Sequence, residues 1–588
     1  MDKPMGVAQL PRMRATLRPL GAFLLGLLLL GVARALPPVA AKLQLFIDRH
    51  EISGAVTLIG DKDNVLSLET VGLADVAAKR PMTDDTLFWI ASMTKSVTGT
   101  AVMLLVSDGK LSVDDPVEKY LPEFKGQQVD AGPGKPTVKQ MRLITIRDLL
   151  THTSGVIPHS VAEDHSLDRV PQREAVASYA RVPLRFQAGN RYEYSNGGIN
   201  TAGRIVEVVS GMPFDRFLEE RLFRPLGMKD TTFWPNTEQL KRLAKSYRPS
   251  ADGKSLVETP IDQLTYPLSD PRRGGAPAGG LFSTAHDLYL LGRMVLNGGS
   301  YGGRRYLTSE AVTQMTSNQI GNLPMNGPDL TYGYGLGWIV HRLHPAGDPT
   351  GPGTFGAGGA YNTQMGIDPV HNLISVMLVQ EAGSPEADRQ ALRATFTQAA
   401  EDAAQARLAE YAGVYALDAH RHFTAVVDPA GGLRIRLTGQ PFFHYGYVGQ
   451  DRFYSPGFAA EFTFNRDAAG HIERVTMRQS WMEMIARRST GPAPTVLFLA
   501  PEKLQAYVGV YEFSPGSRFE ITAKGDQLYA QLPGQPAFPV DCDRPDHFAY
   551  EVINATVNFE RDADGTITAL SLDQGPRSTR ATRIVAGR

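Results

Sequence analysis

Apolar and polar residues follow three different patterns along the chain. Residues 20–32 form an almost uninterrupted apolar run. From about residue 40 to residue 400, segments with the 3.6-residue period of helices alternate with strand-like runs. Beyond residue 405 the pattern changes to short strands separated by turn residues. These patterns predict a short leader, a mixed helix-and-sheet domain and a β-rich tail.

Within the mixed region, an extended run ends and a helix begins close to one serine. Residues 86–90 read as an extended apolar run, and residues 97–105 are apolar enough to form a buried helix. Ser92 and Lys95 lie at this junction, three residues apart. Side chains at that spacing share one face of a helix, so we expect the lysine amine beside the serine hydroxyl.

This pair can carry nucleophilic chemistry. A serine hydroxyl attacks well only when a neighbouring base removes its proton, and a lysine can be that base if burial or nearby cations lower its pKa. The N–H groups at the start of the helix can stabilise an oxyanion. The spacing alone is weak evidence, because chance gives about two such pairs in a chain of this length. Ser107 and Lys110 share the spacing, but the Asp-Gly between them predicts a helix C-terminal turn.

The β-rich tail contains an internal repeat. Three short strings recur in the same order, the first at an offset of 96 residues and the third at an offset of 95. The matched segments are 411–415 with 507–511, 437–441 with 532–536, and 464–470 with 559–565. Two copies of one small β domain follow from this order, and strands at short regular spacing favour closed antiparallel barrels.

Length and composition agree with several folded domains. At 588 residues the chain is too long for one ordinary domain, and 42% hydrophobic with 21% charged residues is typical of soluble globular proteins. The net charge of −1 gives no reason to expect nucleic acid or an anionic membrane surface as partner. We predict a signal peptide at 1–35, a catalytic domain at 36–404, and β-barrels at 405–497 and 498–588.

The leader has the features of a secretory signal. Three arginines precede the apolar run, and Ala33 to Ala35 gives the small-x-small pattern of a cleavage site. The run is shorter than the roughly 20 residues of a membrane span, which favours cleavage near Ala35 over an uncleaved anchor. We therefore expect a periplasmic or secreted protein with no membrane span after cleavage. Cys542 is the only cysteine, so an internal disulfide and a thiolate metal site are excluded, and the 13 scattered histidines suggest no metal or cofactor.

Four motifs occur in a recognisable order. They are Ser-x-x-Lys at 92–95, Leu-Leu-Thr-His-Thr-Ser-Gly at 149–155, Tyr-Ser-Asn at 194–196 and Pro-Leu-Gly-Met at 225–228. Together they resemble the class C β-lactamase-like serine hydrolases, which include penicillin-binding proteins, D-aminopeptidases, D,D-carboxypeptidases and esterases. The resemblance covers roughly residues 40–400. It implies an α/β (α+β) serine β-lactamase/transpeptidase-like domain, an antiparallel sheet flanked by helices. The tail resembles the two C-terminal lipocalin-like β-barrels of D-aminopeptidases.

The resemblance implies roles for individual residues. Ser92 is the expected acylated nucleophile, and Lys95 is its base partner. Tyr194 is expected to be a second base and the acid for the leaving group, which requires a cation such as Lys95 to lower its ordinary pKa of about 10. Asn196 is expected to hydrogen-bond Lys95 and the substrate carbonyl region. For His152, a hydrogen-bonded histidine that ends a short helix is favoured over a catalytic role.

The chain departs from the family pattern in the third motif. The family places Lys, His or Trp, then any residue, then Gly on the strand that lines the pocket, and the matching segment 356–360 has Ala357 at the first position. A methyl group cannot bind a substrate carboxylate, so β-lactams and D,D-carboxypeptidase substrates are disfavoured. The N–H groups of Ser92 and Ala360 are the expected oxyanion donors. Gly359, in the same motif, is also expected to belong to the substrate-binding and oxyanion segment.

Four aromatic residues flank the third motif, three before it and one directly after it. They are Tyr332, Tyr334, Trp338 and Tyr361. They either line one apolar substrate pocket, with Tyr361 as a binding residue, or belong to the core.

The sequence therefore predicts an exported serine hydrolase that forms an acyl-enzyme on Ser92 and cleaves esters or amides. The substrate is a small molecule or a short peptide. A D-aminopeptidase and a catalytically weak penicillin-binding or sensing protein remain as alternatives. The oligomeric state stays open.

Overall fold

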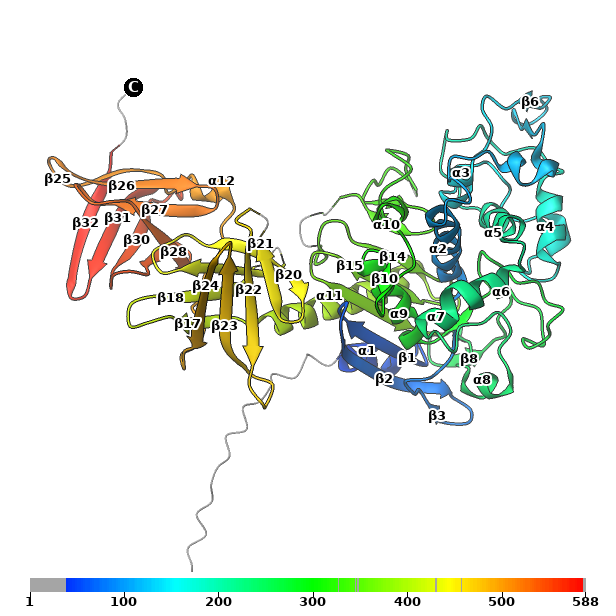
Figure 1. Cartoon of the computed structure of the whole chain (residues 1–588), viewed down its shortest axis with the longest axis horizontal. Coiled ribbons are helices and arrows are strands. Elements are labelled where there is room, and N and C mark those ends of the chain that lie inside the picture. The colour runs from blue at the N-terminus through cyan, green and yellow to red at the C-terminus, as the bar shows by residue number, and fades with distance from the viewer. Residues whose placement is uncertain are drawn as a thin grey trace, which may run out of the picture. The chain divides into compact units, whose positions relative to one another are not determined.

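The computed structural model describes residues 39–584 except 326, 344, 346, 347, 429, 430 and 456 (Figure 1). The predicted signal peptide therefore lies outside the described residues. Within the described part of the chain, no helix combines the length and the apolar character that crossing a bilayer requires.

The first domain is built on an antiparallel sheet. The described residues contain eight strands in this sheet, and every neighbouring pair is antiparallel. Their spatial order is β12 (Tyr332–Tyr334), β13 (Ile339–His341), β14 (Phe355–Gly358), β15 (Gln364–Asp368), β16 (Leu373–Leu378), β1 (Gly54–Gly60), β2 (Val65–Asp75) and β3 (Arg80–Pro81). The expected antiparallel sheet flanked by helices is confirmed.

Helices cover both faces of this sheet at its centre. On one face, α1 (Val39–Asp48) and α11 (Glu386–Leu408) share an apolar cluster with β1 and β16. On the other face, α9 (Ala285–Leu296) packs against β1 and β16. Because it is covered on both sides, every residue of β1 is buried, and the strand has no polar alternation.

A group of helices stands beside the sheet and surrounds α2 (Thr94–Ser107). Every residue of α2 from Thr94 to Leu105 is buried, and the polar side chains of its first two turns are buried together with the apolar ones that follow. Its neighbours α5 (Asn196–Ser210) and α10 (Ser309–Thr316) pack against it. At Gly99 a Cβ atom would lie 2.1 Å from the Leu336 carbonyl oxygen, so glycine permits this close approach. The other described α-helices are α3 (Ile146–Leu150), α4 (Gln172–Tyr179), α6 (Phe214–Leu218), α7 (Arg224–Leu226), α8 (Thr237–Arg242) and α12 (Pro501–Leu504).

The tail forms two closed eight-stranded antiparallel barrels, as the repeat predicted. The first barrel consists of β17 (Gly413–Ala416), β18 (His422–Val427), β19 (Leu433–Leu437), β20 (Phe443–Gly449), β21 (Arg452–Ser455), β22 (Ala460–Arg466), β23 (Ile472–Gln479) and β24 (Met482–Arg488). The second consists of β25 (Gly509–Ser514), β26 (Ser517–Lys524), β27 (Gln527–Gln531), β28 (Phe538–Arg544), β29 (His547–Tyr550), β30 (Thr556–Arg561), β31 (Ile567–Gln574) and β32 (Arg577–Arg583). In each barrel the first strand pairs with the last, so no sheet edge is left open.

The repeat also includes the residues that lead into each barrel. Tyr411 packs in the first barrel core, and its hydroxyl donates to Asp451, which also pairs with Arg466. In the second barrel, the corresponding residues are Tyr507, Asp546 and Arg561, with the same contacts.

The end of α11 moves the predicted boundary between the first domain and the tail. This helix continues to Leu408, whose side chain belongs to the first barrel core. The boundary predicted after residue 404 therefore lies inside a helix, and the first barrel strand begins at Gly413. The last residues of this helix, 405–408, lie in the segment where the sequence pattern was expected to change to strands.

Candidate active site

Ser92 lies in a sharp turn between a strand and the buried helix. The chain leaves β4 (Phe88–Trp89), forms a short 3-10 turn over Ala91–Met93 and continues directly into α2. Ala91 has φ 46°, in the left-handed region that costs an L-residue roughly 1–2 kcal/mol. Strain of this kind, immediately before a candidate nucleophile, is common at functional sites. The predicted junction is therefore present, and it leaves the Ser92 side chain partly exposed.

Lys95 is buried behind Ser92. Its Nζ lies 3.0 Å from Ser92 Oγ and donates to the Ala278 carbonyl oxygen at 2.6 Å. Its side chain is almost wholly removed from water, and this burial lowers the pKa of Lys95 to about 7. Near neutral pH a substantial fraction of the amine is therefore uncharged and can accept the proton of the Ser92 hydroxyl.

Tyr194 reaches the same serine from a different part of the chain. Its hydroxyl lies 2.8 Å from Ser92 Oγ, and Lys95 Nζ lies 4.6 Å from the centre of its ring. The side chain as a whole is 42% exposed, but its surroundings are packed, and burial raises the pKa of Tyr194 to about 12 against a smaller lowering by the bond to Ser92. The expected lowering by Lys95 is absent: burial has the larger effect on the pKa of Tyr194, and the bond to Ser92 has the smaller one.

Asn196 takes a different place from the one expected. It is the first residue of α5, whose N-cap is Ser195, with Oγ accepting from the Gly198 N–H at 2.9 Å. Among the described residues, none forms a hydrogen bond with the Asn196 side chain, and the Lys95 amine is held by the Ala278 carbonyl instead. The expected bond from Asn196 to Lys95 is therefore not formed.

The third motif lies against the serine turn. At Gly359 a Cβ atom would lie 2.1 Å from Thr363 Oγ1 and 2.5 Å from the Ile90 carbonyl oxygen, so only glycine allows this contact. The Gly359 N–H donates to the Thr363 carbonyl at 2.8 Å. In the described part of the chain, the N–H groups of Ser92 and Ala360 have no backbone or side-chain acceptor, which leaves both available to an oxyanion.

Ala357 presents a methyl group in β14. Its side chain is 9% exposed and belongs to the main apolar core of the domain. The cationic or large side chain that the family carries at this position therefore has no equivalent on this strand, as the sequence predicted.

The four aromatic residues do not line one pocket. Trp338 is fully buried against Phe355. Tyr361 packs edge-on against Trp89 in a separate core cluster and donates to Asp262. The side chain of Tyr361 is 3% exposed in this core, so the structure places the ring among core residues and not on a pocket surface.

Of the four, only Tyr334 lies beside the candidate site. It is buried against the rings of His152 and Tyr192. Tyr332 is half exposed and packs on His341. The sequence did not single out Tyr192, and it could not identify Ala278, which contributes only a backbone carbonyl.

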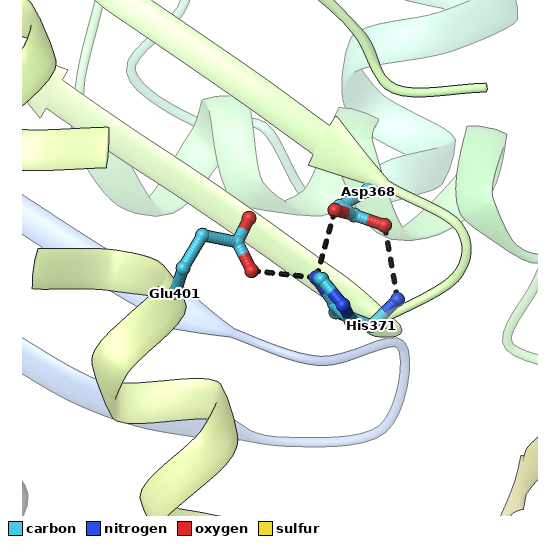
Figure 2. Close-up of side chains that lie close together, drawn as sticks. All are labelled: Asp368, His371 and Glu401. Carbon is cyan, nitrogen blue, oxygen red and sulfur yellow. Dashed lines mark hydrogen bonds and ion pairs between the residues drawn. The ribbon is translucent and has the colours of Figure 1, made fainter. Parts of the chain in front are cut away.

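One further cluster has the side-chain types of a metal site. Figure 2 shows Asp368 at the end of β15, His371 in the following turn and Glu401 on α11. His371 Nδ1 lies 2.7 Å from a Glu401 carboxylate oxygen and 3.0 Å from an Asp368 oxygen, and Asp368 also accepts backbone N–H groups of Val370 and His371. These are hydrogen-bond distances, and a shared proton fits them better than a metal ion, whose tetrahedral ligands stand about 3.3 Å apart at bond lengths near 2.0 Å. The cluster ties the β15–β16 turn to α11.

Two family profiles match the chain. A profile described as Beta-lactamase matches residues 39–400, and a domain of unknown function, DUF3471, matches residues 498–583. The second match falls on the second barrel.

Several proteins are similar to part of this chain. An uncharacterized protein of Mycobacterium tuberculosis (strain CDC 1551 / Oshkosh) is 34% identical over 366 residues, covering 58% of this chain and 88% of that protein. A protein of Escherichia coli (strain K12) described as "Putative D-alanyl-D-alanine carboxypeptidase" is 32% identical over 330 residues, covering 52% and 72%.

Solved structures are similar in fold. EstCE1, a hydrolase with promiscuous acyltransferase activity, has a TM-score of 0.54 and 24% identity, covering 61% of this chain and 97% of that one. Simvastatin synthase (LovD) from Aspergillus terreus has a TM-score of 0.52 and 21% identity, covering 62% and 97%. At these identities the likeness concerns the fold.

Proposed function

The chain belongs to the beta-lactamase family, and from this premise we propose that it is a serine hydrolase that forms an acyl-enzyme on Ser92. One observation carries the proposal. Ser92 Oγ is contacted both by the buried amine of Lys95 at 3.0 Å and by the hydroxyl of Tyr194 at 2.8 Å. A nucleophile, a base with a pKa near the working pH and a second proton carrier thus meet at one atom.

In the first half-reaction the substrate acylates the enzyme. The neutral Lys95 amine takes the Ser92 hydroxyl proton as Oγ bonds to the acyl carbon. The negative charge moves to the carbonyl oxygen, which accepts from the N–H groups of Ser92 and Ala360. As the intermediate collapses, the bond to the leaving group breaks. Tyr194 donates its proton to that group and is reprotonated by the Lys95 ammonium.

In the second half-reaction water releases the acyl group. Lys95, neutral again, takes a proton from water through the Tyr194 hydroxyl, and the water oxygen bonds to the acyl carbon. The bond from that carbon to Ser92 Oγ then breaks, and Oγ recovers a proton from the lysine. The free carboxylic acid leaves, and the site returns to its starting protonation.

The preferred substrates are esters or amides that carry no carboxylate next to the reacting carbonyl. Ala357 supports this class, because its methyl group offers neither charge nor hydrogen bond on the strand beside the oxyanion donors. A D-aminopeptidase is the second candidate within the same chemistry, favoured by the two C-terminal barrels.

Covalent labelling tests the proposal. Intact-mass analysis after incubation with a fluorophosphonate should show one adduct on the wild-type protein and none on Ser92→Ala. Ser107→Ala is the matched control, because Ser107 has the same spacing to Lys110 but lies at the other end of α2. An adduct that persists in Ser92→Ala would place the nucleophile elsewhere. Labelling of Ser92 by a fluorescent penicillin without turnover of any ester or amide would favour the binding or sensing alternative.

A further inference from the structure

His152 contacts three consecutive residues centred on Tyr194. Its carbonyl oxygen accepts from the Glu193 N–H at 2.9 Å, and its ring Nδ1 accepts from the Ser195 N–H at 3.1 Å. Between these bonds, the imidazole ring lies 4.5 Å from the Tyr194 ring, centre to centre, with an angle of 33° between the planes. One histidine thus holds the backbone on both sides of Tyr194 and supports the ring itself.

The surroundings keep this imidazole neutral. The ring is 1% exposed and packs edge-on against Tyr334 and Tyr192. Because Nδ1 accepts a hydrogen bond, the proton of the neutral ring is assigned to Nε2, which has no hydrogen-bond partner in the described part of the chain. Burial and then the charge of Lys95 hold the pKa of His152 well below its ordinary range.

The backbone conformation of His152 also contributes to its contacts with the Tyr194 segment. His152 has φ 60°, in the left-handed region, where His and Asn are tolerated better than most residues. This conformation follows the end of α3 and turns both the carbonyl and the ring of one residue toward the Tyr194 segment.

We propose that neutral His152 is a positioning residue that holds the Tyr194 hydroxyl at hydrogen-bond distance from Ser92. The proposal rests on the hydrolase function proposed above and adds a residue to it. Tyr194 is 42% exposed, so the open side of its ring does little to fix the position of the hydroxyl. Misplacement of a catalytic group by about 1 Å can cost about a hundredfold in rate, and the His152 contacts oppose such a displacement.

Protonation would release this contact. An imidazolium has no acceptor at Nδ1, so the Ser195 N–H would lose its partner, and a second cation would face Lys95. The titratable groups around the ring are Lys95, Tyr192, Tyr194 and Tyr334, which add no negative charge near neutral pH. At acid pH, the rise of kcat/KM with pH should therefore report the titration of Lys95, with His152 neutral throughout.

Two substitutions separate the contributions of His152. His152→Asn keeps an acceptor at the Nδ1 position and tolerates the left-handed backbone, whereas His152→Phe keeps a ring and removes the acceptor. We expect His152→Phe to lower kcat roughly 10- to 100-fold with KM within about twofold, and His152→Asn to retain most of the activity. His165→Asn is the control, because His165 is another left-handed histidine, exposed and outside the site.

A double-mutant cycle gives the decisive test. If His152 acts through Tyr194, adding His152→Phe to Tyr194→Phe should lower kcat by less than about twofold further. If the two substitutions lower kcat by factors that multiply in the double variant, the proposal is overturned. A His152→Phe variant with wild-type kcat would overturn it as well. If His152→Phe does not fold, His152→Gln, which moves the acceptor outward, takes its place in the cycle. Wild-type protein that never labels at Ser92 refutes the hydrolase function, whereas normal labelling with multiplicative costs refutes the role of His152 alone.

Discussion

Lys95 and Tyr194 are neighbours whose pKa values are moved in opposite directions by the same burial. The Lys95 amine lies 4.6 Å from the centre of the Tyr194 ring, and both groups reach Ser92 Oγ. Burial lowers the pKa of Lys95 to about 7 and raises that of Tyr194 to about 12. The amine is therefore the group that can accept a proton near neutral pH, and the phenol is the group that stays protonated to donate one.

We expect the pH dependence of kcat/KM to report the titration of Lys95. Below about pH 7 the protonated amine cannot act as a base, so activity should rise with pH through this value. The rate of p-nitrophenyl butyrate hydrolysis between pH 5 and 9 measures this limb. Lys95→Ala should lower kcat roughly 10²- to 10⁴-fold, and Lys110→Ala, a half-exposed lysine, should change neither rate nor profile. An acid limb centred near pH 5 would rule out Lys95 as the base.

The sequence predicted the parts of this site that depend on spacing along the chain. Ser92 and Lys95 could be paired because two residues three apart on a helix must share a face. The barrels could be predicted because matching strings recur at a nearly constant offset. Tyr194 came from motif order, since no spacing rule relates it to a serine 102 residues earlier.

Other features of the site depend on burial or on backbone atoms, so no sequence pattern predicts them. The raised pKa of Tyr194 depends on surroundings that form only when distant segments pack. Ala278 holds Lys95 through a carbonyl that any residue could supply. Trp338 and Tyr361 looked equivalent to Tyr334 in sequence, yet they pack into two different cores.

The cluster formed by Asp368, His371 and Glu401 should make stability depend on pH. Burial alone favours neutral imidazole, but the two carboxylates outweigh it and raise the pKa of His371 to about 10, above the ordinary 6.5. The folded state therefore binds this proton more tightly, so the stabilisation is complete below about pH 6.5 and is lost as pH rises toward 10. Burial also raises the pKa of Glu401 to about 7, which acts in the same direction at lower pH.

Thermal unfolding of variants measures this effect. His371→Gln should flatten the fall in Tm between pH 6.5 and 10 and, by leaving two buried carboxylates without their cation, cost roughly 3–5 kcal/mol at neutral pH. His420→Gln, at an exposed histidine, should leave the curve unchanged. A wild-type Tm that is constant or rises over this pH range would contradict the assignment of a protonated His371.

The corrected end of α11 predicts a sharp difference between two truncations. Arg407 forms an ion pair with Asp61, whose side chain is 3% exposed. A chain that ends at residue 404 leaves this buried carboxylate without its cation and with the N–H groups of Asp63 and Asn64 as its remaining donors, at a cost of up to roughly 3–5 kcal/mol. A chain that ends at residue 408 keeps the ion pair. We expect the longer version to be soluble and to unfold cooperatively, and the shorter one to melt at clearly lower temperature. Equal melting temperatures would show that Arg407 contributes nothing, and two insoluble products would show that the first domain needs the barrels.

Substrate preference tests the consequence of Ala357. Its methyl group lies on the strand beside the oxyanion donors, and a charged hydrogen bond to a substrate carboxylate is worth roughly 1.5–3 kcal/mol, or about 10- to 100-fold in kcat/KM. The wild type lacks this contact, so kcat/KM for p-nitrophenyl butyrate should exceed that for nitrocefin. Nitrocefin turnover that matches the ester would refute the preference.

Adding a cation at position 357 should change the ratio of kcat/KM for nitrocefin to kcat/KM for p-nitrophenyl butyrate. Ala357→His places an imidazole on β14, whereas Ala416→His adds one at an exposed position on β17 as control. A larger side chain at a position that is 9% exposed can destabilise the fold by roughly 1–3 kcal/mol. The ratio of two kcat/KM values from one sample does not depend on the fraction of folded enzyme, so loss of stability cannot imitate a change in specificity. Ala357→His should shift the ratio toward nitrocefin and Ala416→His should not; equal ratios in the two variants would show that position 357 does not face the substrate.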